Sequence, residues 1–158
     1  MKTLITYYSY SGITEKVINM FKEALEKKSE LKVQRLKPKE EITSFFGQCM
    51  AARFKKRCEI EEALFDASSY DTIIIGLPVW AFAPVPAINT YLDKVTGLDN
   101  KKLIVLLTSG SGAGVKMCFK YINSIISSKG VSNISEINIP NARMKDKNFI
   151  ISSLEKAL

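Results

Sequence analysis

Three short runs of the chain lack charge and are apolar or hydroxyl-bearing at every position: Leu4–Tyr8, Thr72–Ile75 and Leu103–Leu107. Runs of this kind, rich in β-branched or aromatic residues, are typical of strands buried on both faces. Such strands occur in parallel sheets, where helical crossovers cover the two faces. This feature restricts the fold to the α/β class. The length of 158 residues fits one domain, which we expect to span 1–158.

Amphipathic helix patterns separate these runs. From Ile13 to Leu25 an apolar residue recurs at every fourth position between charged ones, which predicts a helix with Ser11 as its N-cap. Further helices are predicted over 84–95, 115–128 and 147–158, and 61–69 is expected to be a short helical turn or loop.

The segment from Glu40 to Arg57 also carries a helical stripe, which Gly47 interrupts. We predict a helix in one or two pieces that covers one face of the sheet. The segment ends in the basic run Arg53–Arg57. With one aromatic residue and no binding motif, this run is favoured as a solvated helix end over a contact with an acidic partner or nucleic acid.

Two further strands, 31–36 and 131–139, alternate apolar with polar residues, which is typical of sheet edges. They are the second and fifth strands in chain order. We therefore predict a three-layer doubly wound sandwich with a five-stranded parallel sheet of order 2-1-3-4-5. In that order the ligand crevice lies at the carboxyl ends of the first and third strands.

The loop from Ser9 to Thr14 connects the first strand to the first helix and carries three hydroxyls around Gly12. Backbone N–H groups, hydroxyls and the positive end of a helix can hold a phosphate without Lys or Arg. A serine-rich turn with an N-cap is the alternative. The loop is neither a Walker A sequence nor a G-x-G-x-x-G fingerprint, which disfavours nucleotide triphosphate chemistry.

Two more loops follow strands on the same predicted edge. The loop 76–84 carries Trp80, the only tryptophan, whose ring could stack on a planar cofactor or be buried in the core. The loop from Ser109 to Gly114 offers small residues and backbone amides, and a tight turn is its alternative.

Taken together, three motifs make the chain resemble the flavodoxin family: Ser9-x-Ser11-Gly12-x-Thr14, the segment from Tyr70-Asp71 to Pro78-Val79-Trp80, and a strand that ends in Thr108-Ser109-Gly110. The resemblance covers nearly the whole chain and implies one bound FMN. It implies that Ser9, Ser11, Gly12, Ile13 and Thr14 bind the phosphate, that Tyr10 also belongs to the cofactor site, and that Pro78, Val79, Trp80, Ala81, Phe82, Ser109, Gly110, Ser111 and Gly112 flank the isoalloxazine.

The chain departs from electron-carrying flavodoxins in two ways. It has a net charge of +7, where those proteins are acidic, and the loop after the fourth strand holds only Ser, Gly and Ala where they usually place a tyrosine. The resemblance itself implies a redox protein that exchanges electrons with partner proteins. An open flavin face favours the alternative, an NAD(P)H-dependent reductase of quinones or other small acceptors.

Composition excludes several other classes of function. There is no His, and the Asp residues lack metal-ligand spacing, so we expect no metal. Three cysteines without a C-x-x-C pair fit a reducing cytoplasm. The stretch 72–92 has no charge, but its Gly and Pro residues argue against a membrane helix, and the N-terminus lacks a secretory pattern. We expect neither nucleic-acid binding nor membrane insertion.

Overall fold

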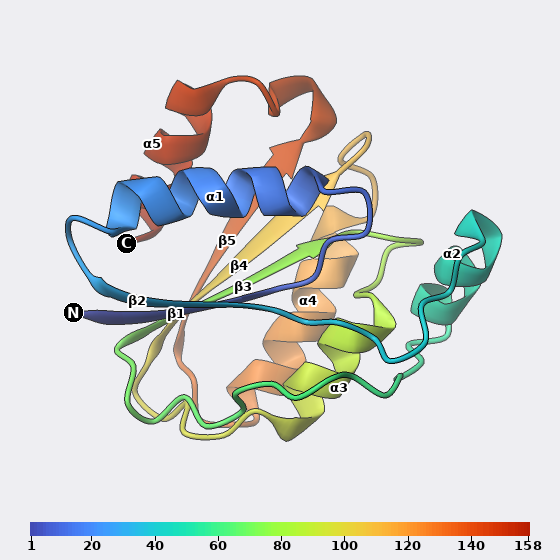
Figure 1. Ribbon diagram of the computed structural model, residues 1–158, viewed down its shortest axis with the longest axis horizontal. Coiled ribbons are helices and arrows are strands. Elements are labelled where there is room, and N and C mark those ends of the chain that lie inside the picture. The colour runs from blue at the N-terminus through green and yellow to red at the C-terminus, as the bar shows by residue number, and fades with distance from the viewer.

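A parallel sheet of five strands forms the centre of the molecule, with helices on both faces, in a computed structural model that describes residues 1–158 (Figure 1). The strands are β1 (Lys2–Tyr7), β2 (Glu30–Arg35), β3 (Thr72–Pro78), β4 (Lys102–Ser109) and β5 (Asn133–Pro140). The helices are α1 (Ile13–Leu25), α2 (Phe45–Arg53), α3 (Pro86–Lys94), α4 (Val115–Ser127) and α5 (Lys147–Ala157), with a short 3-10 turn, η1 (Asn141–Arg143).

The strand order is β2-β1-β3-β4-β5, and every neighbouring pair is parallel. This confirms the predicted sheet and its two polar edge strands. The register sets Ile5 of β1 opposite Ile74 of β3 and Ile74 opposite Ile104 of β4. Because all strands run in one direction, the loops that follow β1, β3 and β4 emerge at the same edge of the sheet.

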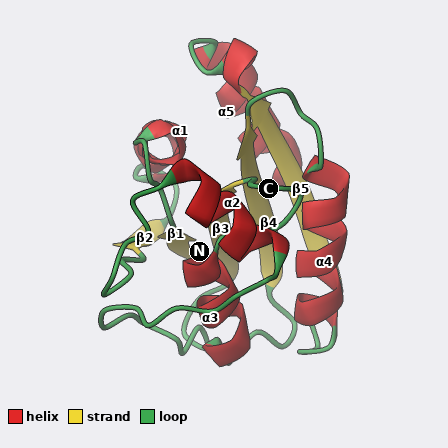
Figure 2. Ribbon diagram, turned by 90° about the vertical axis from the view of Figure 1, so that its right-hand side faces the viewer, coloured by secondary structure: helices red, strands yellow, loops and turns green.

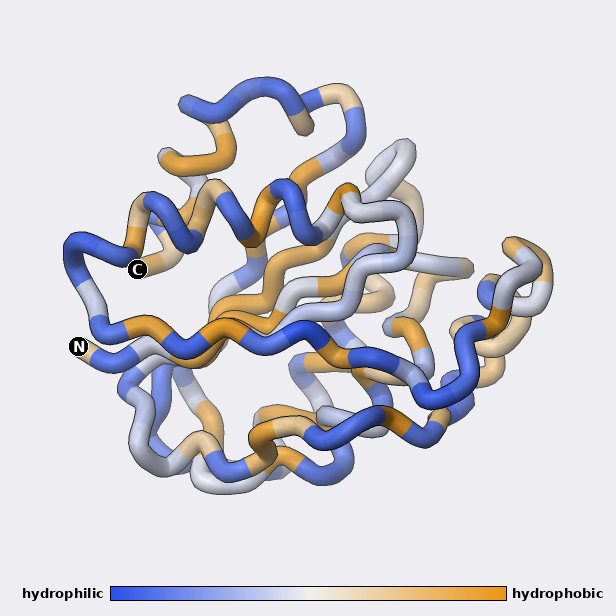
Figure 3. The backbone as a smooth tube through the Cα atoms, in the orientation of Figure 1, coloured by the Kyte–Doolittle hydropathy of each residue, from blue (hydrophilic) through white to orange (hydrophobic).

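Two separate cores lie against the two faces of the sheet. One is formed with α1 and α5 and includes Phe21 and Ile74, and the other is formed with α3 and α4 and includes Tyr91 and Ile73. Figure 3 shows continuous hydrophobic stretches along the inner strands of the sheet. The apolar runs of the sequence are therefore buried on both sides, as predicted.

Segment 40–57 forms a helix in one piece, which is one of the two predicted forms, but the prediction that it covers a face of the sheet is wrong. Helix α2 is a short helix that runs through Gly47 without a break, with Ser44 as its N-cap. It lies beyond the carboxyl edge of the sheet and covers neither face (Figures 1 and 2). The four other helices already cover both faces, so the aromatic stripe of this segment finds no core, and Phe45 and Phe46 remain exposed.

Residues 61–69 form a loop, which is one of the two forms predicted for them. The third helix starts at Pro86, slightly later than predicted, because Val85 before this proline is extended. None of the helices combines the length and the apolar composition that crossing a bilayer requires.

Candidate functional site

A cavity of about 470 Å³ lies at the carboxyl edge of the sheet, between the loops after β1, β3 and β4 and helix α2. This volume is within the range of small-molecule and cofactor sites. Its lining residues are Ser9, Tyr10, Ser11, Ile13, Thr14, Phe45, Gln48, Cys49, Pro78, Val79, Trp80, Ala81, Thr108, Ser109, Gly110 and Asn141.

Most of the residues predicted from the three loops meet at this cavity. Four of them do not line it. Gly12 forms the N-cap of α1, Phe82 packs against the start of α4, and Ser111 and Gly112 lie further along the exposed loop after β4.

The loop after β1 leaves a run of backbone donors free. No backbone N–H group from Ser9 to Thr14 donates to another group of the protein. Gly12 has a left-handed backbone with φ of 82°, and nothing lies near the position that a Cβ atom would occupy there. The loop therefore presents successive N–H groups beside the positive end of α1, an arrangement that suits an anion.

The hydroxyls of this loop differ in their contacts within the protein. Ser11 is not the N-cap, because the left-handed Gly12 occupies that position without a side-chain bond. Instead the Ser9 hydroxyl accepts a hydrogen bond from the Glu15 N–H at 3.3 Å. The Thr14 hydroxyl bonds that of Thr108 at 2.8 Å, which ties the loop to the end of β4. Ser11 is left facing the cavity.

Arg35 at the end of β2 holds the loop from behind. Its guanidinium donates to the Ser9 carbonyl at 2.8 Å and pairs with Glu15 at 3.3 Å. The Tyr7 hydroxyl donates to the same Glu15 at 2.8 Å. Burial and this bond raise the pKa of Tyr7 to about 12, so Tyr7 remains a neutral donor. The conformation of the loop thus depends on an edge strand.

Trp80 forms one wall of the cavity. Its ring packs edge-to-face on Tyr8 and Tyr10, each with ring centres 5.9 Å apart, and it is half-buried. The Tyr8 hydroxyl donates to Glu41 at 2.6 Å, and the Tyr10 hydroxyl donates to the Thr43 carbonyl at 3.1 Å. Trp80 therefore both packs on the core and faces the cavity, and the two tyrosines connect it to the segment before α2.

Helix α2 contributes the cavity residues that sequence reasoning missed. Phe45, Gln48 and Cys49 lie on one helical face, at i, i+3 and i+4. The apolar stripe of this segment is visible in the sequence, but it predicts a helix face packed on the sheet. Thr108 was visible as the last residue before the glycine-rich loop, whereas Asn141 had no signal beyond its position after Pro140.

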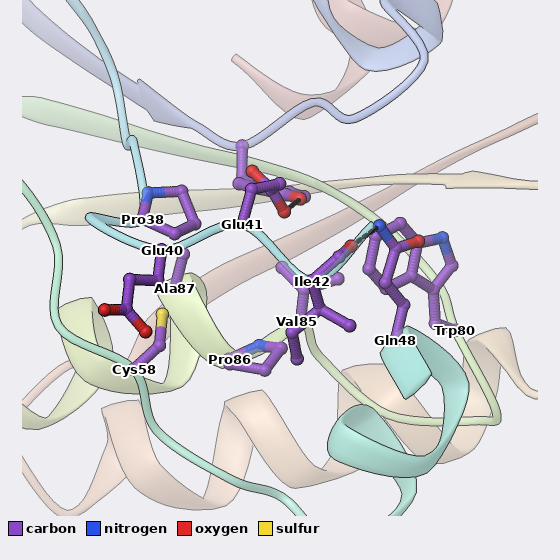
Figure 4. A pocket seen from close by; sticks show the side chains of 11 residues that line it. Pro38, Glu40, Glu41, Ile42, Gln48, Cys58, Trp80, Val85, Pro86 and Ala87 are labelled. Atoms are coloured by element: carbon purple, nitrogen blue, oxygen red, sulfur yellow. Dashed lines mark hydrogen bonds between the residues drawn. The ribbon is translucent and has the colours of Figure 1, made fainter. Parts of the chain in front are cut away.

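Gln48 is a buried polar residue between two cavities. Its side-chain N–H group donates to the Ile42 carbonyl, while its carbonyl oxygen has no partner in the protein. Gln48 and Trp80 line the main cavity and also a second cavity of about 20 Å³ beside α3. Figure 4 shows both residues at one end of this second cavity. An unpaired buried acceptor is costly, so this oxygen is suited to a donor group of a ligand.

A family model described as flavodoxin matches residues 2–150. The chain belongs to the flavodoxin family. No curated protein matches it in sequence.

Solved structures similar to this family member have its fold. A flavoprotein from Lactobacillus acidophilus NCFM in complex with FMN is 23% identical with a TM-score of 0.67, over 93% of this chain and 98% of that chain. Oxidised flavodoxin 1 from Bacillus cereus is 14% identical with a TM-score of 0.61, over 98% of each chain. An azoreductase from Bacillus anthracis str. Sterne is 18% identical with a TM-score of 0.57, over 99% of this chain and 97% of that chain.

The loop after β3 in this flavodoxin-family chain contains a strained turn. The N–H and carbonyl groups of Trp80 and Ala83 bond each other, at 2.9 and 3.3 Å. Between them Ala81 and Phe82 both have left-handed backbones, with φ of 44° and 67°. Two adjacent residues with side chains in this region are strained, and such strain gathers at functional sites.

We expect Ala81→Gly to stabilise the flavin-free protein by up to about 1 kcal/mol, because glycine adopts the left-handed backbone without strain. Urea unfolding measures the change. Ala113→Gly is the matched control, since Ala113 is an exposed loop residue with negative φ, and there glycine should destabilise. Equal destabilisation by both variants would contradict the assigned strain.

Proposed function

We propose that residues 1–158 form one flavodoxin-like domain that binds one FMN non-covalently in this cavity and passes electrons between partner proteins. The observation that carries this proposal is the run of free N–H groups from Ser9 to Thr14. Such a run, at the start of a helix after the first strand, fits a phosphate dianion. A phosphate there directs the rest of the ligand along the cavity toward Trp80.

The remaining cavity residues also fit FMN. Trp80 and Val79 offer an apolar wall for a planar ring, and the unpaired Gln48 oxygen can accept from an N–H or O–H group of the flavin. Bound FMN supplies the redox-active ring, while the chain binds and orients it and excludes water. Of the residues that the resemblance implies, Ser9, Ser11, Gly12, Ile13 and Thr14 would hold the phosphate.

A reductase that takes hydride from NADH or NADPH for a quinone or similar acceptor is the second candidate. The loop after β4 favours it, because Gly110 lines the cavity and nothing lies within 4 Å of the position that a Cβ atom would occupy there. A second planar molecule would approach the flavin from this open side of the cavity. The structural similarity does not separate the two candidates, because it includes both flavodoxins and azoreductases.

We place the protein in the cytoplasm. All three cysteines, Cys49, Cys58 and Cys118, are free, and burial raises the pKa of Cys118 to about 12. Free thiols fit a reducing compartment.

Ser11→Asp tests the phosphate position. The purified wild-type protein should show flavin absorption bands or take up added FMN. The variant should bind FMN at least about 100-fold more weakly, because its carboxylate would lie beside the phosphate. The affinity for riboflavin, which lacks the phosphate, should fall much less between the wild type and the variant. Ser132→Asp, at the opposite end of the sheet, is the control. Undiminished FMN uptake by Ser11→Asp would contradict the assignment.

The response of the bound flavin to NADH or NADPH distinguishes an electron carrier from a reductase. An electron carrier should keep its oxidised flavin spectrum after anaerobic mixing with NADH or NADPH. Potentiometric titration should then reduce it in two resolved one-electron steps. Rapid bleaching by either nucleotide would instead establish the reductase, and a protein that takes up no FMN would exclude both candidates.

Cys49 reports occupancy of the cavity independently of the phosphate loop. FMN should slow its alkylation by iodoacetamide by at least about tenfold if the bound flavin covers it. Cys58 is the internal control, because it lies outside the main cavity and its rate should not change with FMN. Peptide mass spectrometry after short labelling measures both rates. Equal effects of FMN on Cys49 and Cys58 would argue against this placement.

A further inference from the structure

Helix α2 exposes large apolar side chains at the mouth of the cavity. Phe45, Phe46 and Phe54 are 74%, 75% and 66% exposed, and Met50 is also exposed. Phe45 lines the cavity as well. Exposed clusters of this kind mark interaction sites, and aromatic residues and methionine are enriched in protein interfaces.

The apolar surface continues onto the start of α4. Lys55, just after α2, lies over the Tyr121 ring of α4, 4.3 Å from its centre. Phe82 packs against Gly114, directly before α4, and the exposed Met117 follows within one helical turn. Figure 2, which looks at the molecule from the side of α2, shows α4 beside it. The two helices therefore frame one surface beside the cavity.

Basic residues surround these apolar side chains. We call the whole surface the α2/α4 patch: Phe45, Phe46, Met50, Phe54, Phe82 and Met117, with the basic residues Arg53, Lys55, Lys56, Lys116 and Lys120. None of these basic side chains pairs with a carboxylate. The neighbouring Arg57 differs, because Asp93 neutralises it at 2.8 Å.

The acidic residues closest in sequence to α2 do not offset this charge. Glu40 and Glu41 line the small cavity beside α3, where the Glu41 carboxylate accepts from Tyr8. The basic side chains of the patch therefore face solvent without a carboxylate at ion-pair distance, although Lys116 interacts at longer range with Glu136 of β5, in a chain whose net charge is +7. Their field attracts anionic surfaces and increases the association rate of a protein with an acidic face.

We propose that the α2/α4 patch is the docking surface for an acidic electron-transfer protein. An acidic rim on the partner would pair with the basic residues, and its apolar centre would cover the exposed Phe and Met side chains. This partner class rests on the proposed function. Because Phe45 borders both the patch and the cavity, a partner seated here lies beside the flavin site.

A second copy of the chain fits the α2/α4 patch less well than an acidic protein does. A symmetric dimer through this surface would bring the same basic residues of two copies together, and like charges in an interface cost affinity. An anionic membrane has suitable charge but offers no redox centre to the adjacent cavity.

Binding to a plant-type [2Fe–2S] ferredoxin, a small acidic protein, is the probe. Surface plasmon resonance at 25 and 200 mM NaCl would be run on FMN-loaded and flavin-free protein. Flavin-free protein should also bind, so failure of the FMN proposal would not hide the result. The wild type should bind at 25 mM NaCl and weaken at 200 mM.

Two triple variants with the same net charge locate the site. Lys56→Glu, Lys116→Glu and Lys120→Glu together should weaken binding at least about tenfold. Lys27→Glu, Lys32→Glu and Lys156→Glu, outside the patch, should change it less than about threefold. Phe46→Ser with Phe54→Ser should also weaken binding about tenfold, without a change in charge.

Four results would overturn the proposal. The first is no binding by the wild type, and the second is equal weakening by both triple variants. The third is binding to anionic phosphatidylglycerol vesicles but not to ferredoxin. The fourth is a wild-type dimer in sedimentation that Phe46→Ser makes monomeric.

Discussion

The burial of β1, β3 and β4 on both faces constrains everything else in this molecule. Strands that are apolar on both sides need helices above and below, and only crossover connections between parallel strands supply them. Ile5, Ile74 and Ile104 meet in this layer. Parallel direction then delivers three loops to one edge. The cavity is thus a consequence of how the sheet buries its strands.

At that edge, long-range contacts set the shape of each loop. Arg35, from an edge strand, bonds the Ser9 carbonyl, and Thr108 bonds Thr14. The Tyr10 hydroxyl links the first loop to Thr43, at the entry to α2. The segment that follows α2 is bonded to α3, because the Asn89 side chain of α3 donates a hydrogen bond to the Lys56 carbonyl. These bonds position a helix that has no place in either core.

The position of α2 places it between the cavity and solvent in this flavodoxin-family chain. One helical face closes the cavity with Phe45, Gln48 and Cys49, while Phe46 and Met50 on another face remain in solvent. A single short element thereby joins a candidate cofactor site to a candidate partner surface. The basic charge around it suits a partner with an acidic surface.

The sequence by itself determined the strand order, the two polar edges and the three loops that meet at the cavity, because apolar periodicity reports burial locally. It also carried the motifs that resemble the family. Only the tertiary structure decided the hydroxyl partners of Ser9 and Thr14, the free Ser11, the unpaired Gln48 oxygen and the place of α2. These depend on contacts between residues far apart in the chain. An aromatic stripe looks the same in sequence whether a core has room for it or, as here, both faces are already covered.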